Sequence, residues 1–463
     1  MRRCSRPVFA GLRERARHDP RAASLLALAQ VIHGRAEGQA ALDRLLSPED
    51  SGFARQKPLL LPPCDRALCT ELFYGVLRHH LRLDWFLRQK LSRPEKLPPE
   101  FFLLLEQGAY SLAHTRIPPH ASVNWAVNLA ANRFGAGLGK VANAVLRDFA
   151  RKLREEYLNP AFYAQTLGEA PDSAEALALF QAVPAWIARL WSESYGRENC
   201  LALLAAGLKA PPQGVRLNAA RPEYPAMRKI LEEQGASPAA PACWALRHSP
   251  ESRPPLADWR RQGLASLQSP AACAALFSLE PANWPLPLWD ACAGGGGKTL
   301  ALLEAGIPVH SASDPSSGRL RRLRADFIRL GLDESLLPRL APLRAEQSGF
   351  KKCFASILVD APCSGLGTLG RRPEIRWRRE EKDLEELIRL QAAILEAAAE
   401  ALLPRAGCRI LYLTCTLNPA ENREQIRRFL NLHPRFKAGG EFQTPAASPL
   451  GEFFYAAELL RKE

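Results

Sequence analysis

The chain has 463 residues, with 62 Lys and Arg against 48 Asp and Glu, and a formal net charge of +14. This length allows two or three domains with separate cores, and the charge favours a polyanionic partner, nucleic acid ahead of a membrane surface. No stretch approaches the ~20 apolar residues of a membrane span, and the 11 cysteines lack paired C-x-x-C spacing, which argues against a zinc site or a disulfide framework and for reduced cytosolic thiols.

Residues 1–155 are predicted to form an all-helical domain. Apolar residues recur at helical spacing along residues 71–87, and the Pro118-Pro119 pair interrupts the pattern between two later helices. Arg78 and Arg82 fall on the face of the 71–87 segment opposite its apolar residues. Such a basic face can bind RNA, and a solvated helix surface is the common alternative.

Residues 156–255 are predicted to hold a linker and a small α+β subdomain. Residues 156–180 are polar and lack a clear period, which is typical of a linker, and a smaller unit begins at Val183. Glycine and proline crowd residues 235–255, which indicates a domain boundary. Strand and helix patterns alternate over residues 256–463, which predicts an α/β domain whose mostly parallel sheet has helices on both faces.

A glycine-rich loop follows the first strand of this last domain, which ends at Asp290. The loop reads Cys292-Ala293-Gly294-Gly295-Gly296-Gly297-Lys298 and opens a helix, so its backbone can approach a polar or anionic ligand closely. A phosphate-binding loop fits Gly297-Lys298-Thr299, but its first glycine would fall on Cys292. A Rossmann-like cofactor site fits better, because Asp314 ends the next strand at the spacing of a ribose-binding acid.

Two cysteines directly follow later strands of the same sheet. Because ligands bind at the carboxyl ends of such strands, Asp360, Cys363 and Cys415 are expected on one rim with the loop. One free thiol is usually inert packing, but two beside a cofactor loop suit methylation of a pyrimidine at carbon five. One thiolate would add to carbon six, a second acid–base group would assist release, and Asp360 and Lys298 would contact the base or line the same cleft. The residues alone do not distinguish the two thiols.

A helix is predicted to begin just after Cys415. Asn418 is the expected cap, Pro419 stands in the first turn, and Glu421 follows three residues after the cap. The N-terminus of this helix would help Cys415 to ionise, since a free thiol titrates near ~8.5.

Four blocks of the last domain resemble the signature motifs of RNA cytosine-C5 methyltransferases. They are Asp290-Ala-Cys-Ala-Gly-Gly-Gly-Gly-Lys-Thr299, Asp360-Ala-Pro-Cys-Ser-Gly-Leu-Gly367, Arg372-Pro-Glu-Ile-Arg-Trp377 and Tyr412-Leu-Thr-Cys-Thr-Leu-Asn-Pro-Ala-Glu-Asn422. Phe73-Tyr-Gly-Val-Leu-Arg78 and Asn143-Ala-Val-Leu-Arg147 resemble the NusB-type RNA-binding helical domain. Nearly the whole chain is thus similar to the bacterial RsmB/Sun/Fmu type. The resemblance implies an all-α NusB-like bundle followed by a Rossmann-like domain with a mostly parallel seven-stranded sheet.

The resemblance implies an enzyme that transfers a methyl group from S-adenosyl-L-methionine to a cytosine of 16S ribosomal RNA. It implies Cys415 as the nucleophile, Cys363 as the thiol that assists product release, residues 292–298 as the cofactor loop, Asp314 as the ribose-binding acid, and Asp360 as shared by cofactor and base. No metal is implied, and we expect a cytoplasmic monomer. The alternatives are a P-loop NTPase acting on RNA and a non-catalytic RNA-binding ribosome assembly factor.

Three departures from the family pattern concern the cofactor site. Gly294 and Gly295 replace an Ala-Pro pair, and Gln268-Ser-Pro replaces a Q-D-A block. Residues 340–345 hold no aspartate, which leaves Glu346 as a displaced substitute for the acid near the adenine. We therefore expect cofactor binding to be weakened but retained.

Arginines interleaved with an aromatic residue follow Cys363. Arg371, Arg372, Arg376 and Trp377 are predicted to contact RNA phosphates and to stack around a flipped-out nucleotide. The alternative is an arginine patch on the protein surface.

Overall fold

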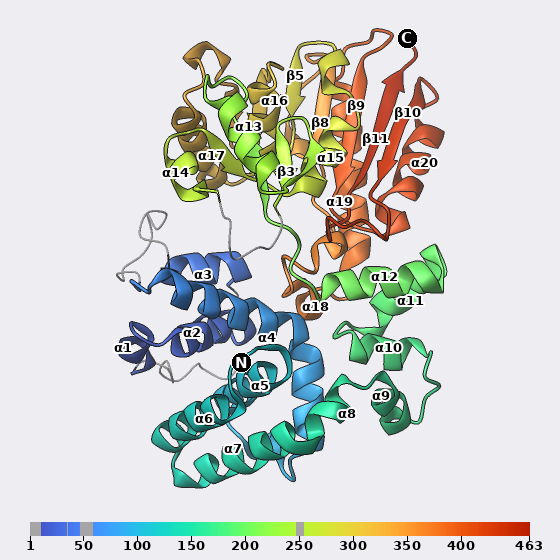
Figure 1. Ribbon diagram of the computed structural model, residues 1–463. Coiled ribbons are helices and arrows are strands. Elements are labelled where there is room, and N and C mark those ends of the chain that lie inside the picture. Colours follow the sequence, from blue (N-terminus) through green and yellow to red (C-terminus); the bar gives the residue numbers. More distant parts are fainter. Residues whose placement is uncertain (1–10, 35, 47–58, 247–253) are drawn as a thin grey trace. The chain divides into compact units, whose positions relative to one another are not determined.

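The computed structural model describes residues 11–34, 36–46, 59–246 and 254–463, which divide into two compact units (Figure 1). Unit 1 holds the described residues up to Lys209 together with Arg372–Arg378, and unit 2 holds Ala210–Arg371 and Arg379–Glu463. The predicted boundaries after residues 155 and 255 do not coincide with this division. Residues 156–209 pack with the helical unit, whereas the described part of residues 210–255 packs with the α/β unit.

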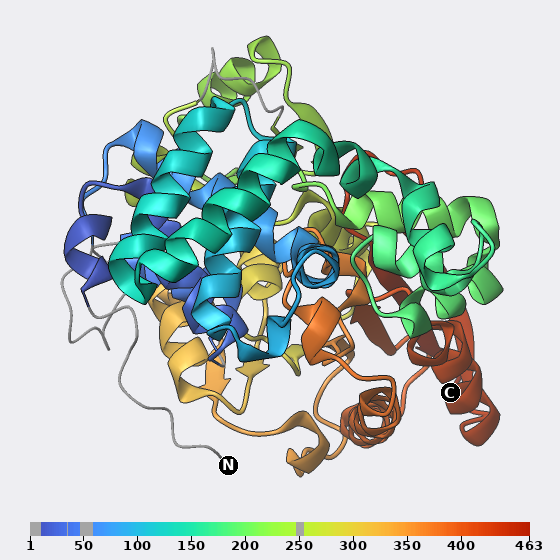
Figure 2. The ribbon, with the colours of Figure 1, turned by 90° about the horizontal axis from the view of Figure 1, so that it is seen from below.

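Unit 1 is helical, as predicted. Its α-helices in the described residues are α1 (Leu12–Ala16), α2 (Pro20–Ile32), α3 (Gly38–Leu46), α4 (Pro63–Gln89), α5 (Pro99–His114), α6 (Pro119–Phe134), α7 (Ala136–Asp148), α8 (Arg154–Leu158), α9 (Pro160–Leu167), α10 (Ala174–Phe180), α11 (Ala185–Tyr195), α12 (Arg197–Gly207) and α18 (Ile375–Arg378). Proline opens α4, α5 and α6, where its missing N–H is no loss. The predicted break at Pro118 is confirmed, because α5 ends before it and α6 begins after it. Figure 2 shows α6 and α7, coloured teal, lying side by side.

The segment predicted as a linker, residues 156–180, is helical instead and forms α9, α10 and the end of α8. Tyr157 and Tyr163 are fully buried in the core of unit 1, and the Tyr163 hydroxyl donates to the Tyr157 carbonyl oxygen at 2.8 Å. The polar composition of this segment concealed the two aromatic side chains that attach it to the core.

The basic face predicted on α4 is buried. Arg78 and Arg82 are 7% and 2% exposed. The Arg82 guanidinium donates to the Phe180 carbonyl oxygen at 2.9 Å and lies 4.3 Å from the centre of the Tyr157 ring. These arginines therefore stabilise unit 1 from within, because α8 and α10 cover a face that would be open to solvent in an isolated helix.

Unit 2 contains a seven-stranded sheet. Its strands are β5 (Leu288–Asp290), β6 (Ser311–Ser313), β7 (Arg339–Ala341), β8 (Ser356–Asp360), β9 (Arg409–Thr414), β10 (Phe436–Gln443) and β11 (Tyr455–Arg461), in the order β10-β11-β9-β8-β5-β6-β7. Only β11 runs against the others among these strands. The predicted mostly parallel sheet is confirmed. The chain crosses from one side of β5 to the other between β7 and β8, and ligands of such sheets bind at this switch point.

Helices cover both faces of this sheet, and they are α15 (Pro270–Phe277), α16 (Gly297–Glu304), α17 (Ser317–Leu330), α19 (Asp383–Ala401) and α20 (Arg423–Leu432). Leu358 and Leu411 pack in one cluster with α15 and α16, whereas their neighbours Ile357 and Ile410 pack in another with α19 and α20. Burial on both faces explains why these strands are continuous apolar runs without alternation.

A smaller antiparallel sheet belongs to the same unit. Its strands are β1 (Gly214–Leu217), β2 (Ser237–Ala240), β3 (Cys243–Ala245) and β4 (Ala265–Leu267), in the order β2-β3-β1-β4, with α13 (Tyr224–Glu233) and α14 (Leu256–Arg261) beside them. The predicted small α+β subdomain therefore exists, but it begins later than predicted and includes β4, which lies beyond the predicted boundary at residue 255.

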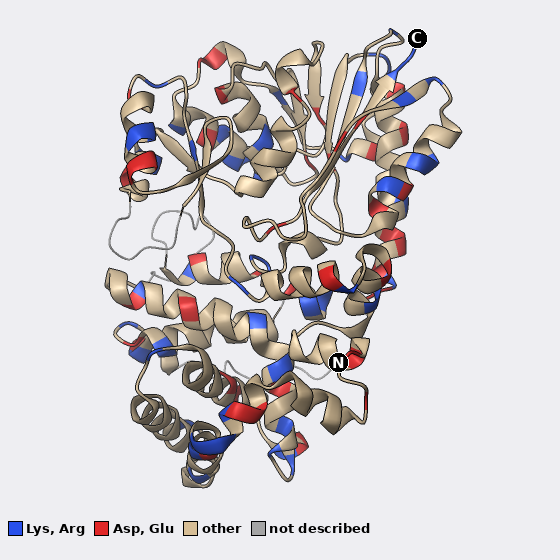
Figure 3. Ribbon diagram, turned by 45° about the vertical axis from the view of Figure 1, so that its right-hand side comes forward, with Lys and Arg blue, Asp and Glu red and all other residues tan. Residues whose placement is uncertain are grey.

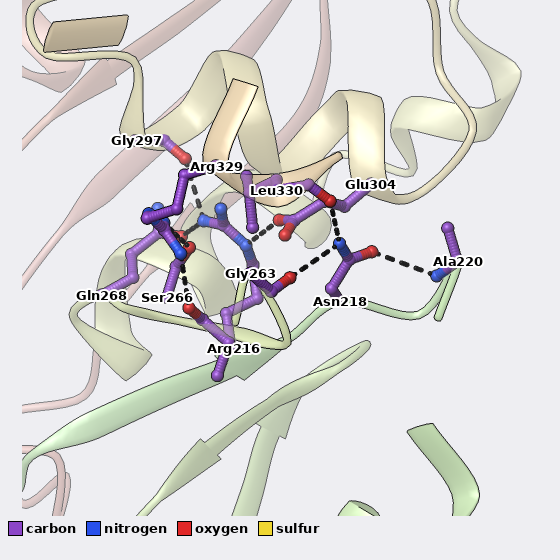
Figure 4. Close-up of polar contacts among 11 residues, drawn as sticks. Arg216, Asn218, Ala220, Gly263, Ser266, Gln268, Gly297, Glu304, Arg329 and Leu330 are labelled. Atoms are coloured by element: carbon purple, nitrogen blue, oxygen red, sulfur yellow. Dashed lines mark hydrogen bonds and ion pairs between the residues drawn. The ribbon is translucent and has the colours of Figure 1, made fainter. Parts of the chain in front are cut away.

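Arg216 in β1 and Asn218 just after it connect the small sheet to helices that pack on the large sheet (Figure 4). The Arg216 guanidinium bonds the Glu304 carboxylate and donates to the Gly297 carbonyl oxygen at 3.0 Å, so it holds both ends of α16. The Asn218 amide donates to the Leu330 carbonyl oxygen at 3.0 Å, at the end of α17. Arg216 and Glu304 are each 3% exposed, so this ion pair is buried.

Charge is spread over both units. Figure 3 shows both Lys and Arg residues and Asp and Glu residues in each of the two units. In the part of the chain that the structure describes, no helix is both long and apolar enough to cross a membrane.

Candidate active site

The glycine-rich loop lies between β5 and α16, as predicted, and Asp290 holds it. Asp290 is fully buried and accepts hydrogen bonds from the Thr299 hydroxyl at 2.6 Å and the Cys292 backbone N–H at 3.3 Å. Burial raises the pKa of Asp290 to about 7, with the nearby Asp360 charge adding to the effect. The buried Asp290 carboxylate therefore fixes the conformation of the loop through these two hydrogen bonds. The sequence motif alone did not identify Thr299 as a partner of Asp290.

Two glycines of the loop have left-handed backbone conformations. Gly294 has φ 57° and open space where a Cβ would lie, so a ligand can approach its backbone. Gly296 has φ 88°, and a Cβ there would lie 2.4 Å from the Leu323 side chain of α17. The first glycine leaves room for a ligand and the second lets two helices pack closely.

Asp314 follows β6 directly, at the position predicted for the ribose-binding acid. Its side chain is 7% exposed, one carboxylate oxygen accepts the Ser316 N–H at 2.8 Å, and the other lies 3.6 Å from the Arg319 guanidinium. Asp314 and the loop come together because β5 and β6 are neighbouring parallel strands.

Lys298 and Asp360 form an ion pair at the rim. The Lys298 ammonium lies 2.5 Å from the Asp360 carboxylate, and their side chains are 11% and 34% exposed. Burial alone would lower the pKa of Lys298, but Asp360 outweighs it, with further contributions from Cys415 and Asp290, so the pKa lies above its ordinary value. Lys298 thus carries a fixed positive charge between a carboxylate and a thiol.

The two rim cysteines are in contact. Cys363 in the loop after β8 and Cys415 directly after β9 have sulfur atoms 3.3 Å apart, and the Cys415 N–H donates to the Cys363 sulfur at 3.3 Å. Both residues are partly exposed. The loops meet closely at Gly367, whose N–H donates to the Cys415 carbonyl oxygen at 3.0 Å and where a Cβ would lie 2.0 Å from the Phe453 carbonyl oxygen.

The surroundings of the two thiols differ. The hydrogen bond to Cys415 is the largest cause that raises the pKa of Cys363 well above its ordinary value, followed by burial and by the charges of Cys415 and Glu421. A raised pKa favours the protonated form of Cys363, which can donate to the Cys415 sulfur. Cys415 in turn lies close enough to Lys298 for a thiolate to interact with the ammonium.

The helix predicted to start at Asn418 begins as a three-residue 3-10 turn, Pro419–Glu421, and α20 starts only at Arg423. Asn418 does cap this turn, accepting the Ala420 N–H at 3.1 Å. Asn422 interrupts the helix, because its side chain bonds the Thr414 hydroxyl at 2.6 Å and the Thr416 carbonyl oxygen at 3.0 Å. A turn this short has little dipole, whereas the Lys298 ammonium is close enough to interact with Cys415.

Sequence reasoning treated Glu421 only as part of this cap. Its carboxylate is fully buried and instead reaches the Ser364 backbone N–H at 2.8 Å, next to Cys363. No local pattern could have revealed this contact, because 57 residues separate the two partners.

The residues predicted to bind RNA do not form one surface. Arg376 is fully buried in unit 1 and donates to the backbone carbonyl oxygens of Gln181, Ala182 and Gly207, so the prediction that it contacts RNA is wrong. Arg371 belongs to unit 2, where it binds the buried Glu452 carboxylate through two nitrogens at 2.8 and 2.7 Å. The sequence showed a run of arginines but did not indicate which of them are buried and which are exposed.

The other two residues of that prediction belong to unit 1. Trp377 is partly buried against its core, with its ring centre 5.0 Å from that of His80. Arg372 is the exposed member, its side chain 49% accessible, and its guanidinium lies 3.9 Å from Glu37.

The departures from the family pattern have structural counterparts. Gln268 accepts from Arg216, and Ser269 caps α15 by accepting the Ala272 N–H at 3.3 Å, the role that an aspartate would also fill. Partial burial is the largest cause that raises the pKa of the Cys292 thiol, and the charges of Asp290, Asp360, Asp314 and Glu346, which follows β7, add to it. Glu346 therefore lies near the cofactor loop.

Residues 11–34, 36–46, 59–246 and 254–463 contain no group of three or more His, Cys, Asp and Glu side chains arranged to hold a metal ion.

Comparisons with known proteins agree with both units. Residues 276–452 match the family described as 16S rRNA methyltransferase RsmB/F, and residues 18–151 match the NusB family. The chain is 33% identical over 413 residues to ribosomal RNA small subunit methyltransferase B from Cronobacter sakazakii, covering 86% of this chain and 91% of that protein. It is 32% identical over 400 residues to probable ribosomal RNA small subunit methyltransferase B from Synechocystis sp., covering 83% and 85%.

Solved structures show the same fold. The crystal structure of PH0851 has a TM-score of 0.70 at 21% identity and covers 100% of both chains. A methyltransferase homolog protein from Pyrococcus horikoshii has a TM-score of 0.51 at 24% identity, covering 62% of this chain and 99% of that one.

The curated relatives and the matched family confirm the predicted family and enzyme class, and they replace the alternatives of a P-loop NTPase and a non-catalytic assembly factor. The chain belongs to the RsmB/F family of S-adenosylmethionine-dependent rRNA methyltransferases.

Proposed function

We propose that this enzyme forms 5-methylcytosine in small-subunit (16S) rRNA through a covalent bond between the Cys415 sulfur and carbon six of the cytosine. One observation carries the proposal: two partly exposed thiols, 3.3 Å apart, follow the ends of adjacent parallel strands beside the Lys298–Asp360 pair. A nitrogen or oxygen of a base is already nucleophilic and needs no thiol. Carbon five of cytosine becomes nucleophilic only after a thiolate has added to carbon six.

The difference between the two thiols supports Cys415 as the nucleophile. The raised pKa of Cys363 favours its protonated form, which can donate to the Cys415 sulfur, and the Lys298 ammonium would stabilise a thiolate at Cys415. After methyl transfer, a base must remove the carbon-five proton so that the bond between carbon six and sulfur can break. The electrons of that C–H bond restore the ring double bond, and the Cys415 sulfur leaves as a thiolate. The Cys363 thiol in contact with it would stabilise this thiolate by donating a hydrogen bond, and we infer that Cys363 assists release in this way.

The loop residues fit a nucleoside cofactor. Bound S-adenosyl-L-methionine would supply the methyl group as an electrophilic sulfonium. Residues 292–298 would hold it through backbone N–H groups at the start of α16, with Gly294 leaving open space. Asp314 would bind the ribose hydroxyls, and Glu346 would replace the acid that the family has near the adenine.

Asp360 is proposed to contact both the cofactor and the target cytosine. Its carboxylate is one-third exposed and is already held by Lys298, so a free acceptor oxygen remains for the cytosine ring nitrogen or amino group. A hydrogen bond there would stabilise the adduct as charge develops on the ring.

The RNA partner follows from the family and from the net charge of +14. Of the arginines after Cys363, Arg372 is retained as the proposed phosphate contact, because it is exposed. The proposed catalytic groups all come from one chain, so a monomer suffices, and a ribosomal substrate is consistent with the cytoplasm.

Two cysteine variants test the proposal. Cys415→Ala should abolish both 5-methylcytosine and any covalent protein–RNA species, because no sulfur can add to the ring. Cys363→Ser should accumulate a covalent protein–RNA species, because its release is slowed. The measurement is denaturing gel electrophoresis of each variant with unmodified 16S rRNA and S-adenosyl-L-methionine, alongside mapping of 5-methylcytosine. Equal loss of the covalent species in both variants would overturn the assigned roles.

A further inference from the structure

We propose that Glu421 is a positioning residue that holds the two cysteine loops in register, so that the sulfur atoms of Cys363 and Cys415 stay aligned for the reaction. The inference rests on the proposed function, because it concerns the same pair of thiols. Glu421 touches neither sulfur within hydrogen-bond distance and acts through Ser364 and its neighbours.

Four donors surround the Glu421 carboxylate. One oxygen accepts the Ser364 N–H at 2.8 Å and the Gln391 amide at 3.0 Å, and the other accepts the Ser364 hydroxyl at 2.5 Å and the Asn418 amide at 3.1 Å. The side chain is fully buried. A buried carboxylate is costly unless it is fully hydrogen-bonded, and here every recorded partner is a donor, so the negative charge is matched.

These donors come from different elements. Ser364 follows Cys363 in the loop after β8, Gln391 belongs to α19, and Asn418 belongs to the turn after Cys415. The Ser364 hydroxyl also lies 2.7 Å from the Thr416 hydroxyl, and Thr416 follows Cys415 directly. Ser364 and Thr416, the residues that follow the two cysteines, are therefore bonded to each other, and Glu421 holds Ser364 in place.

Glutamine has the shape of glutamate but cannot replace it here. Its amide would direct N–H groups at two of the four donors, which would force Ser364 or Asn418 to move. Sulfur atoms only 3.3 Å apart tolerate little movement if one must attack and the other assist release. A misplacement of about 1 Å can lower turnover by about 100-fold.

The experiment compares Glu421→Gln with Glu386→Gln, a matched change at an exposed position of α19. The full chain is assayed with unmodified 16S rRNA and S-adenosyl-L-methionine. We expect Glu421→Gln to lower kcat about 100-fold while the KM values for both substrates and the calorimetric Kd for S-adenosyl-L-methionine stay within about twofold, because the cofactor loop is not part of this network. Glu386→Gln should match the wild type.

Ser364→Ala provides a second measurement. It removes the hydroxyl bonds to Glu421 and Thr416 but keeps the carboxylate, so its loss of kcat should be smaller. The loss in the double variant should be less than the product of the two single losses, because both changes break one network. Should Glu421→Gln fail to fold, Ser364→Ala alone must show a reduced kcat at unchanged KM.

The outcomes separate the two ideas. A folded Glu421→Gln enzyme with kcat within about threefold of the wild type, or one that loses kcat and cofactor affinity equally, would overturn the positioning role while the proposed function stands. A wild-type enzyme that makes no 5-methylcytosine in the same assay would overturn the proposed function itself.

Discussion

At the scale of single residues, the rim of the sheet shows how one type of group takes different roles through burial. Asp290 and Asp360 are the last residues of β5 and β8, yet Asp290 is fully buried under the loop, whereas the Asp360 side chain remains one-third exposed. The Asp290 carboxylate is therefore occupied by the loop itself, whereas the Asp360 carboxylate can still meet a ligand.

This difference makes a prediction for pH. The pKa of Asp290 is raised by burial from 3.8 to about 7, so the folded protein prefers the protonated form. The stability that depends on this proton is present below pH ~4 and is lost as pH rises through ~7, by an amount of up to about 4 kcal/mol. Asp290→Asn removes this loss. The free energy of unfolding in urea should therefore favour the variant over the wild type more strongly at pH 8 than at pH 5.

The test compares the stability difference between variant and wild type at pH 5 with that at pH 8. Effects of the substitution that do not involve protonation are the same at both pH values and cancel. A difference between variant and wild type that does not change with pH would contradict the assigned protonation. Thr299 and the Cys292 N–H can still bond to an asparagine, which makes this the least disruptive replacement.

At the scale of secondary structure, α16 is held by more than its own hydrogen bonds. Arg216 from the small sheet bonds the carbonyl of Gly297 at its start and the carboxylate of Glu304 at its end. Since Gly297 also belongs to the proposed cofactor loop, the small sheet supports that loop directly, although it contributes none of the predicted cofactor residues.

Arg216→Met should destabilise unit 2 by about 3–5 kcal/mol, because it leaves the Glu304 carboxylate buried without its cation. The double variant Arg216→Met, Glu304→Met should recover much of this loss, since buried ion pairs can be replaced by apolar side chains at little cost. Urea unfolding of the two proteins provides the measurement. A double variant no more stable than the single one would show that the ion pair is not the source of the effect.

At the scale of the whole molecule, the chain returns to unit 1 late in the sequence. Arg372–Arg378 packs with the helical unit, although the residues on both sides of it belong to unit 2. Arg376 anchors the segment through three backbone carbonyl oxygens, and burial, with Arg78 and Arg82, lowers its pKa to about 9, which still leaves it charged at neutral pH.

Arg376 and Arg372 should therefore respond differently to substitution. Arg376→Met should destabilise the protein by about 3 kcal/mol, because buried carbonyl groups lose their donors, and should leave the salt dependence of RNA binding unchanged. Arg372→Met should leave stability within about 0.5 kcal/mol and reduce the slope of log K against log salt by about 1. Thermal unfolding and RNA titrations at several salt concentrations measure both. A reduced slope for Arg376→Met would restore its predicted RNA contact.

Much of the fold was predictable because it depends on short-range patterns. Apolar runs that end in Asp290, Asp360 and Thr414 predicted buried parallel strands, and the shared edge of those strands brought the loop and both cysteines together. The break between α5 and α6 at Pro118-Pro119 follows from proline itself. The small subdomain and the segment of residues 156–180 were harder, because their packing depends on a few buried side chains.

The sequence by itself determined which chemical groups line the rim, because strand period and chain order bring the same strand ends together whatever the distant partners are. Only the tertiary structure decided that the two sulfur atoms are in contact, that Arg376 is a buried anchor, and that Glu421 and Arg216 bond distant segments beside the rim. Each of these roles depends on burial and on partners 52 to 195 residues away along the chain, and no local pattern carries that information.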